Sequence, residues 1–89
     1  MRAATAATLH ANTATIQQLG RRYGLHSFVL SSEPGELVAT LEEGRTYFDI
    51  TAFEADASHL LGATVEVVPR GPGVDVQEQG PLCESRGAA

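Results

Sequence analysis

The chain has 89 residues, of which 43% are hydrophobic, and its six arginines and eleven carboxylates give a formal net charge of −5. This length allows one small domain, and the composition argues against disorder over most of the chain. The acidic balance argues against direct binding of DNA or RNA, because Arg21 and Arg22 form its only local basic feature. The charge suits a basic protein partner, and it equally keeps a small protein in solution.

Three features of the sequence bear on location. Cys83 is the only cysteine, so no internal disulfide can form, as is usual in a reducing compartment. The N-terminal residues lack the continuous apolar core of a secretion signal. No stretch approaches the roughly 20 apolar residues of a membrane span. We therefore expect a cytoplasmic protein that does not bind a membrane.

The N-terminal part of the chain predicts a helix after an irregular start. We expect residues 1–12 to be a lead-in that is either frayed or helical. A helix is predicted over residues 13–23, because apolar residues recur there at the spacing of one helix face. These residues are Ile16, Leu19, Gly20 and Tyr23. Asn12 or Thr13 can cap its start, and Gly24 can end it in the left-handed conformation.

The next segment predicts a β-hairpin. Residues 27–31 are rich in β-forming side chains, and residues 36–42 place Leu37 and Ala39 on one face and Val38 on the other. Between these strands, proline and glycine stand where a tight turn favours them. Two strands joined by four turn residues are typical of an antiparallel hairpin.

A second helix and a third strand complete the pattern. Thr46 and Asp49 match a capping box at the start of a helix over residues 47–61, and Gly62 ends it. Residues 63–69 then predict a strand. The helix is long enough for a right-handed crossover, which makes the strands before and after it parallel.

The order helix, hairpin, helix, strand predicts an α/β (α+β) fold with one domain at residues 13–69. We expect a three-stranded mixed sheet, an antiparallel hairpin plus one parallel strand, packed with two helices. Residues 70–89 contain four glycines and two prolines. They are expected to form a loosely held tail with one ordered piece at residues 74–78.

Two runs of this sequence resemble a known family. IQQLGRRYGLHSFVL resembles the first helix and strand of the minimal nucleotidyltransferases of the polymerase-beta superfamily. LVATLEEGRTYFDITAFEADASHLLGATVEVV is similar to the strand, loop, helix and strand that close that domain. The resemblance covers residues 14–69, rests on the order and spacing of these segments, and implies a nucleotidyltransferase-like fold.

The chain departs from this family at the segment that carries its chemistry. The family holds nucleotide phosphates with a Gly-Ser turn at a helix N-terminus and two Mg²⁺ ions with three carboxylates. Here the segment between the first two strands is missing, and the resemblance places Pro34, Glu36 and Glu66 at the carboxylate positions. Proline supplies no ligand, and glutamate is one methylene longer than aspartate. Glu36 and Glu66 remain weak metal candidates, and we expect no catalytic residues, no bound metal and no cofactor.

The resemblance implies a protein-interaction module without catalysis. Minimal nucleotidyltransferases of this type are typically paired with all-helical HEPN-type ribonuclease toxins, so a copy without the catalytic segment can act only by binding. It would serve as an antitoxin-like partner or as a self-associating module. The alternative is a residual nucleotidyltransferase or nucleotide-binding domain that uses Glu36 and Glu66. A third interpretation is a decayed remnant that still folds.

A contact surface is predicted from the open edges of the sheet. In the expected topology, residues 27–31 and 63–69 form the two edges. The second edge is protected by Glu66 and Pro69, whereas the first is uncharged and lacks proline. We therefore predict a homodimer or a bound partner at the first edge and at the neighbouring aromatic helix. The predicted contact residues are Ser27, Phe28, Val29, Leu30 and Phe48.

Overall fold

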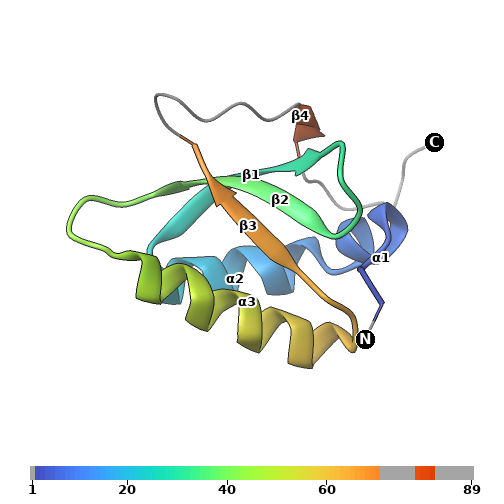
Figure 1. The fold of residues 1–89 in the computed structure, drawn as a ribbon, viewed down its shortest axis with the longest axis horizontal. Helices are drawn as coiled ribbons and strands as arrows, with labels where there is room; N and C mark the ends of the chain where they lie inside the picture. The colour runs from blue at the N-terminus through green and yellow to red at the C-terminus, as the bar shows by residue number, and fades with distance from the viewer. Residues whose placement is uncertain (1, 71–77, 82–89) are drawn as a thin grey trace.

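A mixed β-sheet with helices packed against it forms the described part of the computed structural model, residues 2–70 and 78–81 (Figure 1). In chain order the elements are α1 (Ala6–Ala11), α2 (Thr13–Tyr23), β1 (Leu25–Ser31), β2 (Glu36–Leu41), α3 (Tyr47–Leu61), β3 (Glu66–Pro69) and β4 (Glu78–Pro81). The strand order is β3-β2-β1-β4, and α2 and α3 lie on the same side of the sheet. The predicted three-stranded mixed sheet with two helices is confirmed, and α1 and β4 are added to it. No helix of the described residues is long and apolar enough to cross a membrane.

Helix α2 begins and ends at the predicted residues. Ile16, Leu19 and Gly20 are buried on its inner face, as their spacing indicates. Gly24 ends the helix in the left-handed conformation, with a φ of 75°. Asn12 occupies the N-cap position, but its side chain makes no capping hydrogen bond. The helix is therefore held at its start by packing and at its end by glycine.

The hairpin forms as predicted. β1 pairs with β2 antiparallel, with Leu25 opposite Leu41 and Leu30 opposite Leu37. β1 begins two residues earlier than predicted, and its first residue, Leu25, is buried in the core. Gly35 closes the turn with a φ of 74°, a conformation that a residue with a side chain rarely adopts. The turn therefore brings the end of β1 beside the start of β2.

Helix α3 and strand β3 form the predicted parallel crossover. Thr46 Oγ1 accepts a hydrogen bond from the Phe48 N–H, and Asp49 Oδ2 accepts one from the Thr46 N–H at 3.0 Å, which completes the capping box. Gly62 ends the helix in the left-handed conformation. β3 then runs parallel to β2, and it begins at Glu66, three residues later than predicted.

The N-terminal lead-in belongs to the same core as the domain. Helix α1 follows Thr5, whose Oγ1 accepts a hydrogen bond from the Thr8 N–H at 3.1 Å. Ala4 and Leu9 are buried, with 1% and 2% of their surface exposed. The Ala4 N–H also donates to the Thr64 carbonyl at 2.9 Å. This N-terminal segment therefore packs into the domain and does not merely precede it.

A fourth strand changes the edges of the sheet. β4 pairs antiparallel with β1, with Pro81 opposite Val29 and Gly80 opposite Leu30. β1 is therefore an inner strand along Val29–Ser31, and the prediction that residues 27–31 form an open edge is wrong for these three residues. The physical reason is that an uncharged strand without proline pairs readily, and the chain supplies a partner from its own C-terminal part. The predicted ordered piece at residues 74–78 meets β4 only at its last residue; residues 74–77, like Cys83, lie outside the described residues.

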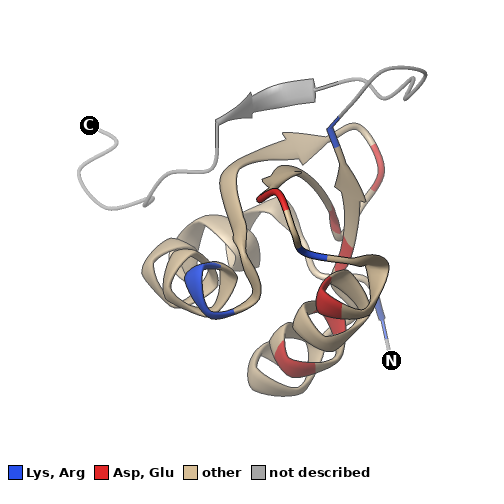
Figure 2. Ribbon diagram, turned by 90° about the vertical axis from the view of Figure 1, so that its left-hand side faces the viewer, with Lys and Arg blue, Asp and Glu red and all other residues tan. Residues whose placement is uncertain are grey.

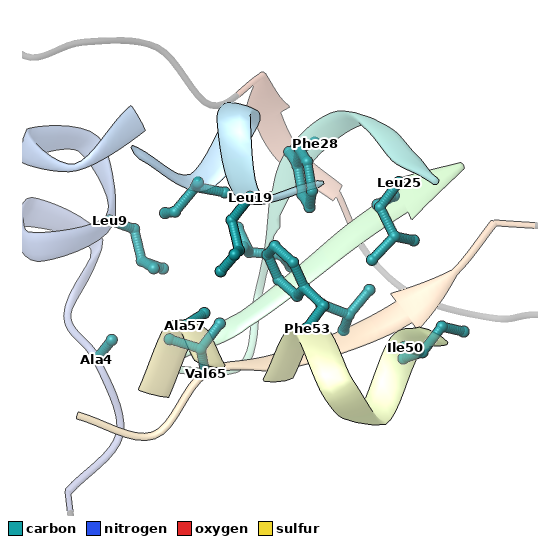
Figure 3. Packing of buried hydrophobic residues seen from close by; sticks show 13 residues of the cluster. Ala4, Leu9, Leu19, Leu25, Phe28, Ile50, Phe53, Ala57 and Val65 are labelled. Atoms are coloured by element: carbon teal, nitrogen blue, oxygen red, sulfur yellow. The ribbon is translucent and has the colours of Figure 1, made fainter. Parts of the chain in front are cut away.

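The core is centred on two aromatic rings. Phe53 of α3 is 0% exposed and stacks on Phe28 of β1, with 5.4 Å between the ring centroids. Figure 3 shows Phe53 pointing from α3 toward Phe28, with Leu19 and Leu25 on either side. Gly20 of α2 lies so close to the Phe28 ring that a Cβ added to it would be 2.6 Å from Phe28 Cε2. The ring pair thus joins α2, α3 and β1.

The substitution Gly20→Ala should destabilise the protein, although alanine is normally favoured over glycine inside a helix by about 1 kcal/mol. The added methyl group would overlap the Phe28 ring and would lie 2.7 Å from the Leu25 carbonyl oxygen. We expect a loss of about 1–3 kcal/mol in the free energy of unfolding, measured by urea denaturation. The control is Gln18→Ala at an exposed position of the same helix, which should change stability by less than about 0.5 kcal/mol. A stabilised Gly20→Ala variant would contradict the close packing of α2 on Phe28.

Candidate functional site

The two weak metal candidates lie side by side. Glu36 and Glu66 are register partners at the starts of the parallel strands β2 and β3. Side chains at matching positions of neighbouring strands project from the same face of a sheet, so the two carboxylates are neighbours. The structure therefore brings together the two glutamates that the nucleotidyltransferase resemblance places at carboxylate positions.

Glu36 is engaged by its own hairpin. The Ser31 hydroxyl donates to Glu36 Oε1 at 2.6 Å, and Ser31 Oγ accepts a hydrogen bond from the Glu33 N–H at 3.2 Å. Ser31 is buried, Glu36 is half-buried and Glu66 is exposed. This network stabilises the turn between β1 and β2, and it occupies one oxygen of the Glu36 carboxylate.

These residues do not fit the magnesium site of the resembled family. Mg²⁺ takes about six oxygen ligands in near-octahedral geometry. Pro34 is exposed in the turn and has no side-chain ligand to offer. Within residues 2–70 and 78–81, no group of three His, Cys, Asp or Glu side chains could hold a metal ion. Glu36 and Glu66 therefore form an acidic pair at the end of the sheet and not a two-metal centre.

A cleft of about 530 Å³ lies between α1 and the hairpin, at the end of the sheet that holds Glu36. Its lining residues are Thr5, Ala6, Leu9, Leu30, Ser31, Ser32, Glu33, Pro34, Gly35 and Glu36. Among the described residues, its charged lining consists of the two glutamates alone, without lysine or arginine. Carboxylates in the lining of a cleft repel the phosphates of a nucleotide. The charge of the cleft therefore has the wrong sign for a nucleotide.

The predicted contact residues do not form one surface. Phe28 is 6% exposed and belongs to the core, and Val29 and Leu30 are half-buried in the inner strand β1. Ser27 is exposed, but it lies within an irregularity of the β1–β2 pairing. Phe48 lies on α3 and is 83% exposed. Because Phe28 is buried and Val29 and Leu30 are paired with strands on both sides, Phe48 is the large apolar residue of this set that remains open to another protein.

Helix α3 exposes apolar side chains at both of its ends. Tyr47 and Phe48 are 67% and 83% exposed in the first turn, and Leu60 is 60% exposed in the last turn. Given about 3.6 residues per turn, the exposed residues Thr51, Ala55 and His59 lie on the same face as Phe48, whereas Tyr47 and Leu60 lie on its two flanks. The residues Asp49, Glu54 and Asp56 are the only Asp, Glu, Lys or Arg residues within Tyr47–Leu61.

Two of these carboxylates are bound to neighbouring backbone. Asp49 accepts the Thr46 N–H of the capping box, and Arg45 Nη1 lies 3.4 Å from its other oxygen. Glu54 Oε2 accepts a hydrogen bond from the Val67 N–H of β3 at 2.7 Å. Both side chains are half-buried. The Asp49 carboxylate therefore lies at the start of the helix, and the Glu54 carboxylate points toward β3.

The third carboxylate, Asp56, links α3 to α2. It accepts a hydrogen bond from the Tyr23 hydroxyl, and this bond raises the pKa of Tyr23 above its ordinary value. Tyr23 and Asp56 are both half-buried between the two helices. With its three carboxylates directed to such partners, α3 presents an outer face of Phe48, Thr51, Ala55 and His59 that contains no Asp, Glu, Lys or Arg.

Comparisons of this chain with protein-family models, with curated proteins and with solved structures gave no match. The resemblance to the minimal nucleotidyltransferases therefore rests on the sequence segments quoted above.

We predict that neither ATP nor GTP with Mg²⁺ binds in the acidic cleft at millimolar nucleotide. The reason is the repulsion between the nucleotide phosphates and Glu33 and Glu36, together with the missing third ligand. Isothermal titration calorimetry checks this, with the Glu36→Gln, Glu66→Gln double variant as the control. Saturable binding by the wild-type chain that the double variant loses would overturn the prediction and support the enzyme alternative.

Proposed function

We propose that this protein is a non-catalytic interaction module that binds a partner protein through the outer face of α3. One observation carries the proposal: Phe48 is 83% exposed, and the exposed residues Thr51 and Ala55 continue its face along α3 without Asp, Glu, Lys or Arg as far as His59 in the last turn. A surface helix normally presents charged side chains to water, and a helix that is apolar on all sides is normally buried. A binding partner would complete that burial.

The exposed aromatic side chains can supply binding energy. Burial of one phenylalanine side chain contributes about 1.5–3 kcal/mol. About 1.4 kcal/mol corresponds to a tenfold change in affinity, so Phe48 alone can determine whether a complex is stable. Thr51 and Ala55 beside it are small, which lets a partner approach the helix closely. Aromatic residues are enriched, and carboxylates depleted, at the centres of protein interfaces.

The charge of the chain indicates the chemistry of the partner. Its net charge is −5, and Figure 2 shows that the charged residues of α3 are all acidic and those of α2 all basic. A partner with an apolar helix face and basic flanks matches α3 better than a second acidic copy of this chain does. The resemblance supports the same choice, because the family is paired with all-helical HEPN-type toxins. We therefore propose an antitoxin-like role in the cytoplasm, exerted by binding to such a protein.

The lack of catalysis in this proposal is supported by the hairpin. Ser31 holds Glu36 by a hydrogen bond, and Pro34 stands where the resemblance expects a carboxylate. Nucleotidyl transfer through Glu36 and Glu66 would require a further metal ligand that the described residues do not bring to this pair. Binding through α3 requires none of these groups.

A photo-crosslinking residue in place of Phe48 tests the proposal in the native cell. We expect p-benzoylphenylalanine at this position to form an adduct with one basic helical protein, which mass spectrometry identifies. The same residue in place of Gln18, which is exposed on α2, should not capture that protein. An adduct between two copies of this chain would show that self-association takes the place of a heterologous partner.

The affinity for the captured protein then measures the contribution of Phe48. Phe48→Ser should weaken binding by at least about tenfold, because an exposed aromatic anchor is lost from the interface. Gln18→Ser should bind as the wild-type chain does. Equal affinities of the Phe48→Ser and wild-type chains would show that α3 is not the interface.

A further inference from the structure

A second pocket, of about 280 Å³, lies between the C-terminal half of α2 and the start of β1. Its lining residues are Gln17, Arg21, Leu25, His26, Ser27 and Phe28. The leucine and the phenylalanine are buried, whereas the four polar residues are exposed. Among the described residues, none that line this pocket is acidic. In a chain with a net charge of −5, the pocket is a local region of positive charge.

Arg21 supplies this charge. It lies four residues after Gln17, so the two side chains share one face of α2. Within residues 2–70 and 78–81, no ion pair or hydrogen bond engages the Arg21 guanidinium. The three carboxylates of the neighbouring helix α3 are bound to Thr46, Val67 and Tyr23. Figure 2 shows the basic residues of α2 apart from the acidic residues of α3. The guanidinium therefore retains its donors for a ligand in the pocket.

The backbone at Ser27 has an unusual conformation. Its φ of 59° is the only positive φ outside glycine among the described residues. The residue lies in an irregularity of the ladder, because His26 pairs with Thr40 and the next pair joins Val29 to Val38. Bulges of this kind redirect side chains and are frequent beside functional sites. Here the bulge places Ser27 at the pocket while the next side chain enters the core.

The contacts around Ser27 prepare its hydroxyl as a donor. Arg70 Nη2 donates to the Ser27 carbonyl at 3.1 Å, and Arg70 Nη1 donates to Thr40 Oγ1 at 2.6 Å, which holds the bulge in place. His26 Nδ1 lies 2.9 Å from Ser27 Oγ. When Nδ1–H donates to this oxygen, the hydroxyl proton is free to donate to an acceptor in the pocket.

We propose that this pocket binds a phosphate group, as inorganic phosphate or as a phosphate monoester, through Arg21 and Ser27 with His26 orienting the serine. The guanidinium presents two parallel N–H donors that match two oxygens of a tetrahedral oxyanion. The serine hydroxyl donates to a third oxygen. The site is separate from the acidic cleft beside Glu36, which repels the same ligand.

Titration of the full chain with inorganic phosphate and with O-phosphoserine, followed by the NMR shifts of the backbone amides, tests the proposal. Sodium chloride keeps the ionic strength constant. We expect saturable shifts confined to the residues that line the pocket. Tighter binding of O-phosphoserine identifies a phosphate monoester as the ligand, and equal or tighter binding of inorganic phosphate identifies the free anion. The absence of saturable shifts with both compounds would overturn the proposal.

Matched variants distinguish a specific phosphate-binding site from non-specific attraction of the anion by positive charge. Arg21→Gln should weaken phosphate binding about tenfold, because a charge-assisted pair of hydrogen bonds is lost. Arg22→Gln removes the same charge from a residue outside the pocket, and it should bind as the wild-type chain does. Ser27→Gly should also weaken binding and should keep the fold, because glycine readily adopts a φ of 59°. Equal losses in Arg21→Gln and Arg22→Gln would show that net charge alone attracts the anion, and would overturn the proposal.

Discussion

The stacking of Phe28 on Phe53 is the contact around which the rest of the molecule is arranged. It joins one strand to the long helix, and Gly20 lets the second helix lie directly on the Phe28 ring. The bulge at Ser27 contributes to this packing, because it interrupts the β1–β2 pairing beside Phe28, whose side chain is buried in the core. Since Phe53 determines which side of α3 faces the sheet, it also determines which side faces solvent.

The functional proposal follows from the orientation of α3. Its buried side is made by residues such as Ile50, Phe53 and Ala57. Its carboxylates are held at the flanks by the N-cap, by β3 and by α2. What remains for the solvent is a face with Phe48 in the first turn, the small residues Thr51 and Ala55 beyond it and His59 in the last turn. In the acidic cleft, by contrast, the Glu36 carboxylate already accepts a hydrogen bond from Ser31.

The features that could be predicted from the sequence are those with local signals. Gly24 and the capping box at Thr46 act within one turn of helix, so the bounds of α2 and α3 follow from neighbouring residues. The pairing of β4 with β1 and the burial of Ala4 depend on contacts between distant segments, which leave no periodic pattern. At the candidate sites, the proximity of Glu36 and Glu66 follows from the predicted parallel strands. The direction of the α3 carboxylates could not be predicted, because their partners lie on other elements.

In this account the Phe53 face of α3 stabilises the fold and the Phe48 face binds a partner. The unfolding of two variants of the isolated chain tests this division most directly. Urea denaturation would compare Phe53→Leu with Phe48→Ser. We predict that Phe53→Leu lowers the free energy of unfolding by about 1–2 kcal/mol, because it leaves a gap under the Phe28 ring. Phe48→Ser should change it by less than about 0.5 kcal/mol, since an exposed side chain contributes little to the fold. A loss in Phe48→Ser as large as that in Phe53→Leu would contradict the claim, because it would place Phe48 in the core.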